Sequence, residues 1–306
     1  MSKKILLIPH IQIQNANALP SPFTIGFPAM TAWLGAAHAL QRRLNEAGID
    51  VQFDGAGVVS HQFDLQTYKG PGDYEHSIIG TANPLDKNGE RPSFIEEARC
   101  HLEVSLAIQY SGINKHQEAE ALERISHCLK GQMKMAGGDI LSFSRPDLFR
   151  DFGMLKNRLM PGYALIERRE LMIEAMQQGQ DALDAMLDYL AIHHSCEQQE
   201  QNGETHITWK SERKSTGNNG ERGWIVPIAT GFQGISELGH AKNQRDPETP
   251  HRFAEAIVTL GEFKMAYRLG SLEELLWHYH HEADQNLYLC QQSHNDPQTL
   301  MSEDGF

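Results

Sequence analysis

The chain opens with an apolar run of strand type, followed by a run with helical spacing. Residues 4–13 are rich in Ile and Leu, which predicts a first β-strand. Residues 28–47 place apolar side chains three or four positions apart, which predicts a helix with one buried face. Pro28 at its start and Gly48 just after its end are typical of helix boundaries.

The same two patterns then repeat. Residues 50–63 and 99–110 alternate apolar and polar positions, as half-buried antiparallel strands do. Residues 115–136 return to helical spacing, with Gly137-Gly138 as the expected helix stop, and residues 139–144 predict a short strand. This β-α-β-β-α-β order is that of ferredoxin-like folds, which include RNA-recognition modules. We therefore predict an α+β protein.

Two domains and two polar inserts are expected. Residues 1–150 would form the ferredoxin-like domain, and residues 64–98, rich in turn signals, would form an extended arm within it or else a disordered loop. Residues 151–306 would complete the fold as a mixed α/β region with a polar, mobile insert at residues 196–222. In that region the pattern predicts strands over 160–168 and 224–231 and helices over 170–192, 251–266 and 271–281.

Composition narrows the classes of protein. No apolar run reaches 18 residues and the first one is too short for a secretory leader, so we expect a cytoplasmic protein without a membrane partner. The four cysteines form no Cys-x-x-Cys pair, which favours free thiols over a zinc site. His278, His280 and His281 lie in a predicted helix that would place only the first and last on one face. We expect a structural role for them, and neither a metal nor a cofactor.

The charge balance is acidic but uneven. Lys and Arg total 27 against 40 Asp and Glu, which gives a net charge of −13, whereas free-standing nucleic-acid-binding proteins are usually basic. Basic residues nevertheless gather in pairs such as Arg42-Arg43 and Arg168-Arg169. These pairs could neutralise phosphates, or be ordinary solvated ends of elements. The pattern suits a subunit that touches nucleic acid on one face and proteins on others.

Short polar and glycine motifs are the further candidates for nucleic-acid contacts. Asn15 and Asn17 could bind base edges or phosphates, or they could stabilise a turn. Gly137-Gly138, one turn after Lys134, could let an RNA backbone approach closely, or could simply cap the preceding helix.

Two other segments have both a functional and a structural interpretation. The proline-bounded run 243–252 could be a rigid loop that holds a nucleic-acid end or another subunit, or a helix start with Thr249 as cap and Pro250 in the first turn. His38 could act as the general base of a metal-independent endoribonuclease that processes RNA, or could pack at the edge of the core.

Several long blocks together resemble one protein family. They are IQIQNANALPSPFTIGFPAMTAWLGAAHALQRR, ARCHLEVSLAI, MKMAGGDIL, LMPGYALIERRE, GWIVPIATGF and RDPETPHRF, in this order along nearly the whole chain. They resemble the second Csy subunit of type I-F CRISPR surveillance (Cascade) complexes, a Cas-five-type protein of antiviral defence. The insert 196–222 and the acidic C-terminal tail match no part of that family's pattern.

The resemblance implies a non-catalytic, RNA-binding subunit of a ribonucleoprotein, in which a separate subunit cuts the precursor RNA. It implies binding to the 5′ handle of CRISPR RNA, pairing with the large (Cas-eight-type) subunit at the tail of the complex, and contact with the adjacent backbone (Cas-seven-type) subunit. Target DNA would be met only indirectly. The implied fold is the RRM-like, RAMP-type ferredoxin unit, with residues 64–98 as its thumb.

The resemblance also suggests which residues bind RNA. Arg245 and Arg252 lie in a matching block, as do the asparagines and Arg42, and Phe27, Phe232 and Trp224 are candidates for stacking on bases, although Trp224 could instead belong to the core. The predicted RNA-binding residues are Asn15, Asn17, Phe27, Arg42, Lys134, Gly137, Gly138, Arg158, Arg168, Phe232, Arg245 and Arg252.

Overall fold

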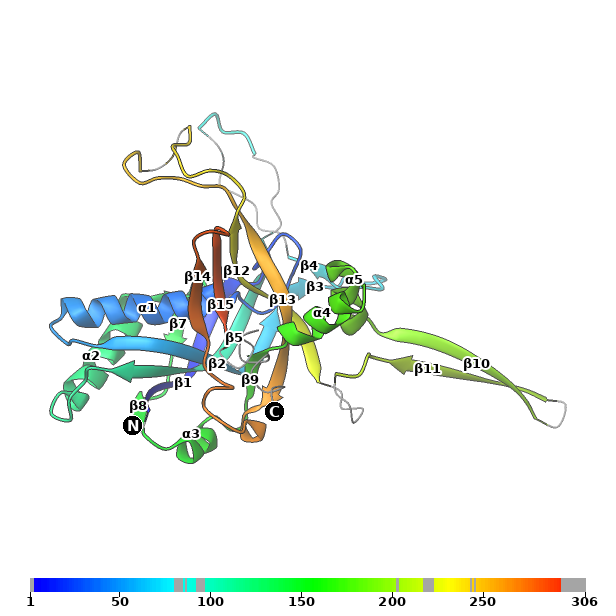
Figure 1. The fold of residues 1–306 in the computed structure, drawn as a ribbon, viewed down its shortest axis with the longest axis horizontal. Helices are drawn as coiled ribbons and strands as arrows, with labels where there is room; N and C mark the ends of the chain where they lie inside the picture. Colours follow the sequence, from blue (N-terminus) through cyan, green and yellow to red (C-terminus); the bar gives the residue numbers. More distant parts are fainter. Residues whose placement is uncertain are drawn as a thin grey trace.

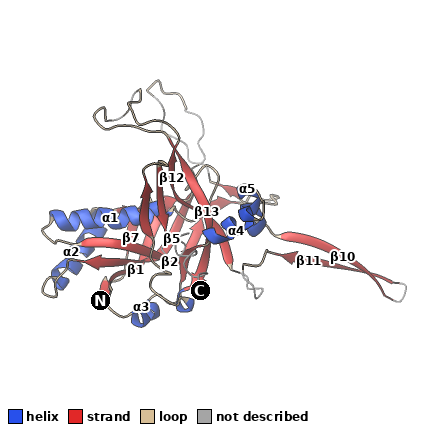
Figure 2. Ribbon diagram, in the orientation of Figure 1, coloured by secondary structure: helices blue, strands red, loops and turns tan. Residues whose placement is uncertain are grey.

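A computed structural model describes residues 3–79, 85, 87–91, 97–201, 204–216, 223–242, 244 and 246–292. Within this part of the chain, an 11-stranded antiparallel sheet runs through the molecule in the order β14-β15-β12-β13-β9-β2-β5-β1-β7-β6, with β8 also paired to β1 (Figures 1 and 2). Its strands are β1 (Lys4–Asn17), β2 (Gln52–Leu65), β5 (Arg99–Ser111), β6 (Lys134–Met135), β7 (Gly138–Ser142), β8 (Asp147–Phe149), β9 (Tyr163–Glu167), β12 (Trp224–Gly234), β13 (Ala254–Met265), β14 (His278–Glu282) and β15 (Leu287–Gln291).

The remaining elements are short helices and two hairpins. The helices are α1 (Met30–Glu46), α2 (Glu118–Gly131), α3 (Phe152–Arg158), α4 (Arg169–Gln177), α5 (Ala182–Leu190) and the 3-10 turn η1 (Ala266–Arg268). The hairpins are β3 (Thr67–Tyr68) with β4 (Ser77–Ile78), and β10 (His193–Gln201) with β11 (Glu204–Glu212). The second hairpin projects far from the body (Figure 1).

The central strands are buried on both faces, which explains the continuous apolar run in β1. Leu6 and Ile8 face the core beneath α1 and α2, whereas Ile5 and Leu7 face a second core closed by α3 and the segment after β13. The apolar stripe of α1 that the spacing predicts, including Trp33, is buried in the first of these cores. Alternate side chains of one strand therefore serve two layers.

The predicted elements of the first half are confirmed, with small shifts at their ends. The strands expected at 4–13, 50–63, 99–110 and 139–144 are β1, β2, β5 and β7, and the helix expected at 28–47 is α1. The second helix, α2, ends well before the predicted glycine stop. All confirmed elements combine a clear period with a turn or helix signal at their boundaries.

Two predicted helices of the second half are wrong. Residues expected to be helical at 251–266 form β13, which pairs with β12 from Ala254 to Phe263 and contains the β-branched run Ile257-Val258-Thr259. The segment expected to be helical at 271–281 is a turn followed by β14. Neither Thr249 nor Pro250 begins a helix, since the loop before β13 closes on a bridge between Gly239 and His251. The apolar residues of β13 are held by sheet pairing, whereas Leu272, Leu275 and Leu276 of the turn before β14 are buried in the second core.

Other predictions need adjustment. The strands expected at 160–168 and 224–231 are confirmed as β9 and β12. The single helix expected over 170–192 is instead two helices, α4 and α5. Gly179, at φ +91°, lies between them, and the Asp181 carboxylate caps the start of α5. The insert 196–222 is not without structure, because its first part belongs to the hairpin β10–β11, and residues 217–222 lie outside the described chain. Only the hairpin β3–β4 and short pieces of the insert 64–98 are described.

The second half of the chain joins the same sheet and core as the first. β9 pairs with β2, and Trp277 exchanges two backbone hydrogen bonds of 3.0 Å with Ala56 of β2. The fully buried Trp277 indole donates to the Leu165 carbonyl oxygen of β9 at 2.9 Å. Strand pairing thereby fixes where the last strands, β14 and β15, lie relative to α1.

In the described parts of the chain, no helix combines the length and apolarity needed to cross a membrane. All four cysteines are free thiols, with Cys100, Cys128 and Cys290 buried and Cys196 exposed. Burial raises the pKa of the Cys100 and Cys290 thiols to about 12, so both remain protonated near neutral pH.

A histidine pair, His10 and His61, lies on the face of the sheet opposite α1. His61 contacts the Pro161 carbonyl oxygen through Nδ1 at 2.6 Å and the Ser105 hydroxyl through Nε2 at 2.7 Å, and it stacks on His10 at 4.3 Å. His10 in turn contacts Glu103 at 2.7 Å. Since a carbonyl oxygen only accepts, the neutral ring carries its proton on Nδ1. Burial is the largest cause and lowers the pKa of His61; the hydrogen bond with Pro161 opposes it, His10 lowers the pKa further, and Glu103 has the smallest, opposing effect.

We expect acid to destabilise the protein partly through His61. Its pKa is lower in the folded chain than in the unfolded chain, so its stabilising contribution is complete above about pH 6.5 and is lost as pH falls through the folded pKa. Urea unfolding midpoints measured between pH 7.5 and pH 5 should fall more steeply for the wild type than for H61Q, which has no ring to protonate. Parallel curves for the two proteins would show that His61 makes no such contribution.

Candidate nucleic-acid interface

A surface groove of about 740 Å³ lies between α1 and the edge strands of the sheet, and we call it the α1 groove. It is lined by Asn17, Pro20, Pro28, Ala29, Thr31, Ala32, Gly35, His38, Arg42, Ala136, Gly137, Phe232, Tyr279 and Tyr288. These residues come from the end of β1, from α1, from the turn between β6 and β7, and from β12, β14 and β15. Segments from both ends of the chain therefore build one surface.

One stripe of α1 forms the long wall of the groove. Thr31, Gly35, His38 and Arg42 follow one another at four-, three- and four-residue steps, which places them on the same face of the helix. This face lies beside the buried one that carries Trp33. Gly35 has no side chain, so the wall is open between Thr31 at the start of the helix and His38 and Arg42 further along it.

Three aromatic residues form the opposite wall, and we call them the aromatic strip: Phe232, Tyr279 and Tyr288. Phe232 lies directly opposite Tyr288 across the β12–β15 pair, and the rings of Tyr279 and Tyr288 are 5.4 Å apart. Their exposed fractions are 44%, 43% and 37%. Rings that are held by strand pairing and half exposed present fixed, flat apolar surfaces to the groove.

The tyrosine hydroxyls of the strip stay neutral. Burial raises the pKa of Tyr279, and the nearby Tyr288 raises it further, while Arg42 opposes the rise. Burial also raises the pKa of Tyr288. Both groups therefore remain hydrogen-bond donors at physiological pH and add no negative charge. Among the described residues that line the groove, Arg42 is the single Lys or Arg and none is Asp or Glu, although the net charge of the chain is −13.

A tight turn closes one end of the groove. Ala136 and Gly137 both have positive φ, +48° and +77°, between the paired residues Met135 and Gly138, as in a type I′ hairpin. Gly137 lines the groove, whereas Gly138 packs on β1, where an added Cβ would lie 2.7 Å from the carbonyl oxygen of Gln14. The expected helix stop at Gly137-Gly138 is thus wrong, and the glycines serve a hairpin turn.

The two predicted asparagines lie in different places, and only one of them lines the groove. Asn17 lines the groove, but its side chain accepts from the Leu19 N–H at 3.1 Å and donates to the Leu19 carbonyl oxygen at 3.2 Å, so it also stabilises a turn. Asn15, at φ +56°, does not line the groove, and its side chain accepts from Gln66 at 2.7 Å. The side-chain amides of both asparagines therefore make hydrogen bonds within the chain.

The three aromatic residues predicted to stack on bases also lie in different places. Phe27 is only 6% exposed and stacks on Trp33 at 5.6 Å, so its ring belongs to the core. Trp224 is 56% exposed, which contradicts the core alternative, and it lines a different pocket of about 370 Å³ together with Phe263. Of the candidates for stacking, only Phe232 lies in the α1 groove.

The predicted basic residues are mostly engaged elsewhere. Lys134 pairs with Asp139 at 2.8 Å, and Arg158 is exposed on α3, away from the groove. Arg168 pairs with Glu170 and Glu262 and is largely buried.

Side-chain hydrogen bonds, one of them to the turn between β14 and β15, hold the loop between β12 and β13 in place. The Arg252 guanidinium donates to the side chain of Asn286. Asp246 accepts from the Thr249 hydroxyl at 2.6 Å, which holds the pKa of Asp246 below its usual range. Arg245 lies outside the described residues. Of the predicted basic residues, the structure brings Arg42 to the groove.

Sequence reasoning missed Tyr279 and Tyr288 because it predicted a helix through the first of them. In β14, alternation places Tyr279 and His281 on one face, and the ring nitrogens of His278 and His280 contact the Asp54 carbonyl oxygen and Glu282, each at 2.8 Å. The alternation of Leu287 and Leu289 around Tyr288 was a strand signal that this reasoning did not use.

Comparisons with known proteins match this chain along most of its length. Residues 6–290 match the family model of the CRISPR-associated protein Csy2. The chain is also 34% identical over 315 residues to the CRISPR-associated protein Csy2 of Pseudomonas aeruginosa (strain UCBPP-PA14), with 93% of this chain and 94% of that protein covered. The matched residues span every element that lines the α1 groove. The chain therefore belongs to the Csy2 family, the second Csy subunit of type I-F CRISPR systems.

Proposed function

We propose that this chain is a non-catalytic subunit of a type I-F surveillance complex and that it holds the 5′ handle of CRISPR RNA in the α1 groove. The aromatic strip is the observation that carries the proposal. Single-stranded RNA is bound largely by stacking of its bases on aromatic rings, aided by positive charge along the backbone. The strip offers three such rings beside Arg42, in a groove whose described lining residues include no carboxylate.

The strand order supports a ferredoxin-like, RRM-like assignment of the first domain. β7, β1, β5 and β2 are neighbours in that order, all antiparallel, and α1 and α2 follow β1 and β5 in the chain. Residues 1–150 would form this RAMP-type unit and residues 151–306 its extension. The α1 groove would then lie at the place where the extension returns to the unit's first helix.

The proposed protein partners follow from the family. They are the large (Cas-eight-type) subunit and the adjacent backbone (Cas-seven-type) subunit, with the arm at residues 64–98 as a thumb, in a cytoplasmic complex that meets target DNA indirectly. Acidic surface on this chain would dock on basic faces of those subunits, which would supply the remaining positive charge around the RNA.

We expect R42A to weaken RNA binding and to reduce its dependence on salt. If Arg42 neutralises one phosphate, its removal should reduce the magnitude of the slope of log K against log salt by about 0.7. The measurement is binding of labelled CRISPR RNA to the chain co-purified with the other Csy subunits, at 50 to 300 mM salt.

The matched control is R145A, which removes an exposed arginine outside the groove. It should leave both the affinity and the slope unchanged. An equal loss in the two variants would mean that Arg42 acts only through net charge, and unchanged binding in R42A would place the RNA elsewhere.

The nuclease alternative is tested with this chain purified alone, because the resemblance implies that a separate subunit of the complex cuts the precursor RNA. His38 lines the α1 groove, so a general-base role predicts cleavage of precursor RNA by this chain without metal, abolished in H38A. The non-catalytic proposal predicts RNA of unchanged length on a denaturing gel with either protein.

A further inference from the structure

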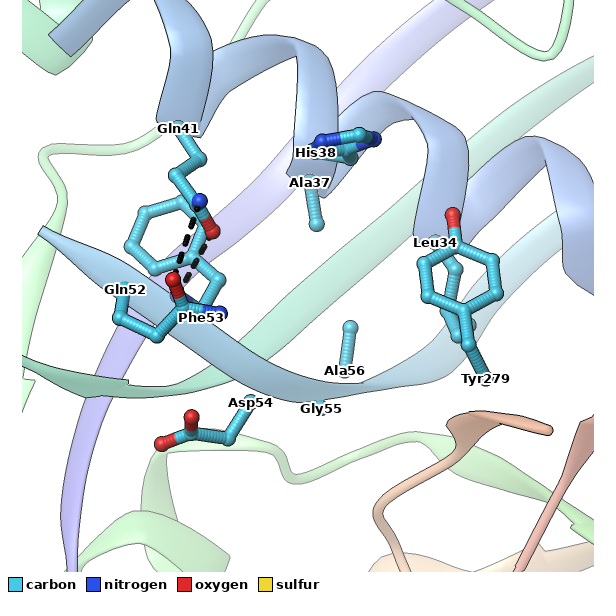
Figure 3. Close-up of a pocket in the computed structure, with 10 residues that line it drawn as sticks. All are labelled: Leu34, Ala37, His38, Gln41, Gln52, Phe53, Asp54, Gly55, Ala56 and Tyr279. Carbon is cyan, nitrogen blue, oxygen red and sulfur yellow. Dashed lines mark hydrogen bonds between the residues drawn. The ribbon is translucent and has the colours of Figure 1, made fainter. Parts of the chain in front are cut away.

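A small pocket opens beside the α1 groove, between α1 and β2. It is lined by Leu34, Ala37, His38, Gln41, Gln52, Phe53, Asp54, Gly55, Ala56 and Tyr279. Figure 3 shows Ala37 and Ala56 facing each other across it, the Tyr279 ring at one end, and Gln41, Gln52 and Phe53 at the other. The pocket exists because small residues stand where helix and strand would otherwise interdigitate. His38 and Tyr279 also line the groove, so the two spaces adjoin.

The size of the pocket limits what it can hold. Its volume is about 160 Å³, and a protein cavity of about 150 Å³ is known to take one benzene ring. A single six-membered ring therefore fits, whereas a peptide segment does not. Of the bases in RNA, only the pyrimidines consist of a single six-membered ring.

The two side-chain amides of the pocket suit the edge of a base, and the Asp54 carboxylate also lines the pocket. The Gln41 carboxamide oxygen accepts the Phe53 backbone N–H at 2.8 Å, which fixes the direction of its amide. The Gln41 nitrogen makes one long contact of 3.4 Å to the Gln52 oxygen, and it has a second hydrogen to donate. A pyrimidine presents acceptors on its edge, which this amide can meet, while its ring lies beside Tyr279.

We infer that the pocket receives one pyrimidine base, turned out of the RNA that lies in the α1 groove, and that Gln41 and Gln52 contact its edge. This inference rests on the proposed function, because it requires RNA in the groove. It adds a specificity-determining site: at one position of the handle the chain would prefer cytosine or uracil to a purine, whose second ring exceeds the pocket.

The test is a base scan of the handle with two pocket variants. In the handle RNA of its own locus, each pyrimidine is changed singly to a purine, and affinity is measured for the chain co-purified with the other Csy subunits. We expect one change to weaken wild-type binding about tenfold. A37L, which fills the pocket, should bind all of these RNAs with equal affinity, about tenfold below the wild type with the natural handle.

Further variants distinguish an effect of the pocket on base preference from an effect on the fold or on RNA binding in the groove. A39L makes the same substitution on the same helix outside the pocket and should retain the wild-type preference, while Q52A, at an exposed position, should reduce the preference without disturbing the fold. If wild type binds RNA but A37L and Q52A keep its full preference, or if wild type has none, the pocket inference is wrong. If wild type binds no RNA at all, the proposed function fails instead.

Discussion

Replacing Phe232, Tyr279 and Tyr288 together by alanine is expected to weaken the binding of CRISPR RNA at least a hundredfold. A base stacked on an aromatic side chain contributes about 1–3 kcal/mol, and a hundredfold loss corresponds to about 2.7 kcal/mol. The three rings together exceed this amount even when each contributes the least. The measurement is fluorescence anisotropy of a labelled handle RNA with the chain co-purified with the other Csy subunits.

The control replaces three more exposed aromatics outside the groove, each at least as large as its counterpart in the strip. Phe23, Tyr74 and Trp209 are 79%, 97% and 72% exposed, and their triple alanine variant should bind RNA as the wild type does. Phenylalanine at positions 279 and 288 keeps the rings and removes only the hydroxyls. If stacking carries the affinity, this variant should retain most of it, and a loss as large as that of the alanine triple would contradict stacking.

W277A is expected to reduce the free energy of unfolding by about 3–5 kcal/mol, the usual cost of removing a large buried aromatic side chain. Trp277 is fully buried, and its loss also leaves the buried Leu165 carbonyl oxygen without its donor. Because Trp277 is paired with Ala56 and directly precedes β14, the loss should also loosen Tyr279 and weaken RNA binding. The measurement is urea unfolding followed by circular dichroism, with RNA affinity measured on the folded variant.

W209A provides the comparison, since the Trp209 side chain is exposed on the projecting hairpin β10–β11. Its unfolding midpoint should match that of the wild type. If W209A destabilised the fold as much as W277A, the hairpin would be packed against the body in solution, and the account of Trp277 as the link between β2, β9 and β14 would lose its support.

The fold of the first half was predictable because periodicity and boundary signals agree there. In α1, Pro28, the apolar stripe with Trp33, and Gly48 all indicate the same helix. In β13 and β14 the periodicity and the boundary signals do not agree. Short apolar runs such as Ile257-Val258 suit a helix or a strand equally, and only pairing with β12 or β15 decides between them.

The site was predictable to the extent that it is local in sequence. Arg42, Gly137 and Asn17 lie in α1, in a glycine turn and at a strand end, which are recognisable in one sequence. The aromatic strip is not local, because Phe232 and Tyr288 meet through strand register across more than fifty residues. Register depends on tertiary pairing, and no short motif carries it.

The position of the RNA in the α1 groove is tested most directly by a crosslinking map of the RNA in the assembled complex. 4-Thiouridine is placed at successive handle positions, irradiated, and the crosslinked peptides of this chain are identified by mass spectrometry. If the RNA lies in the α1 groove, we expect crosslinks to peptides that contain Phe232, Tyr279 or Tyr288, together with peptides from α1. Crosslinks confined to the hairpin β10–β11 or to the face of the sheet that carries His61 would contradict it.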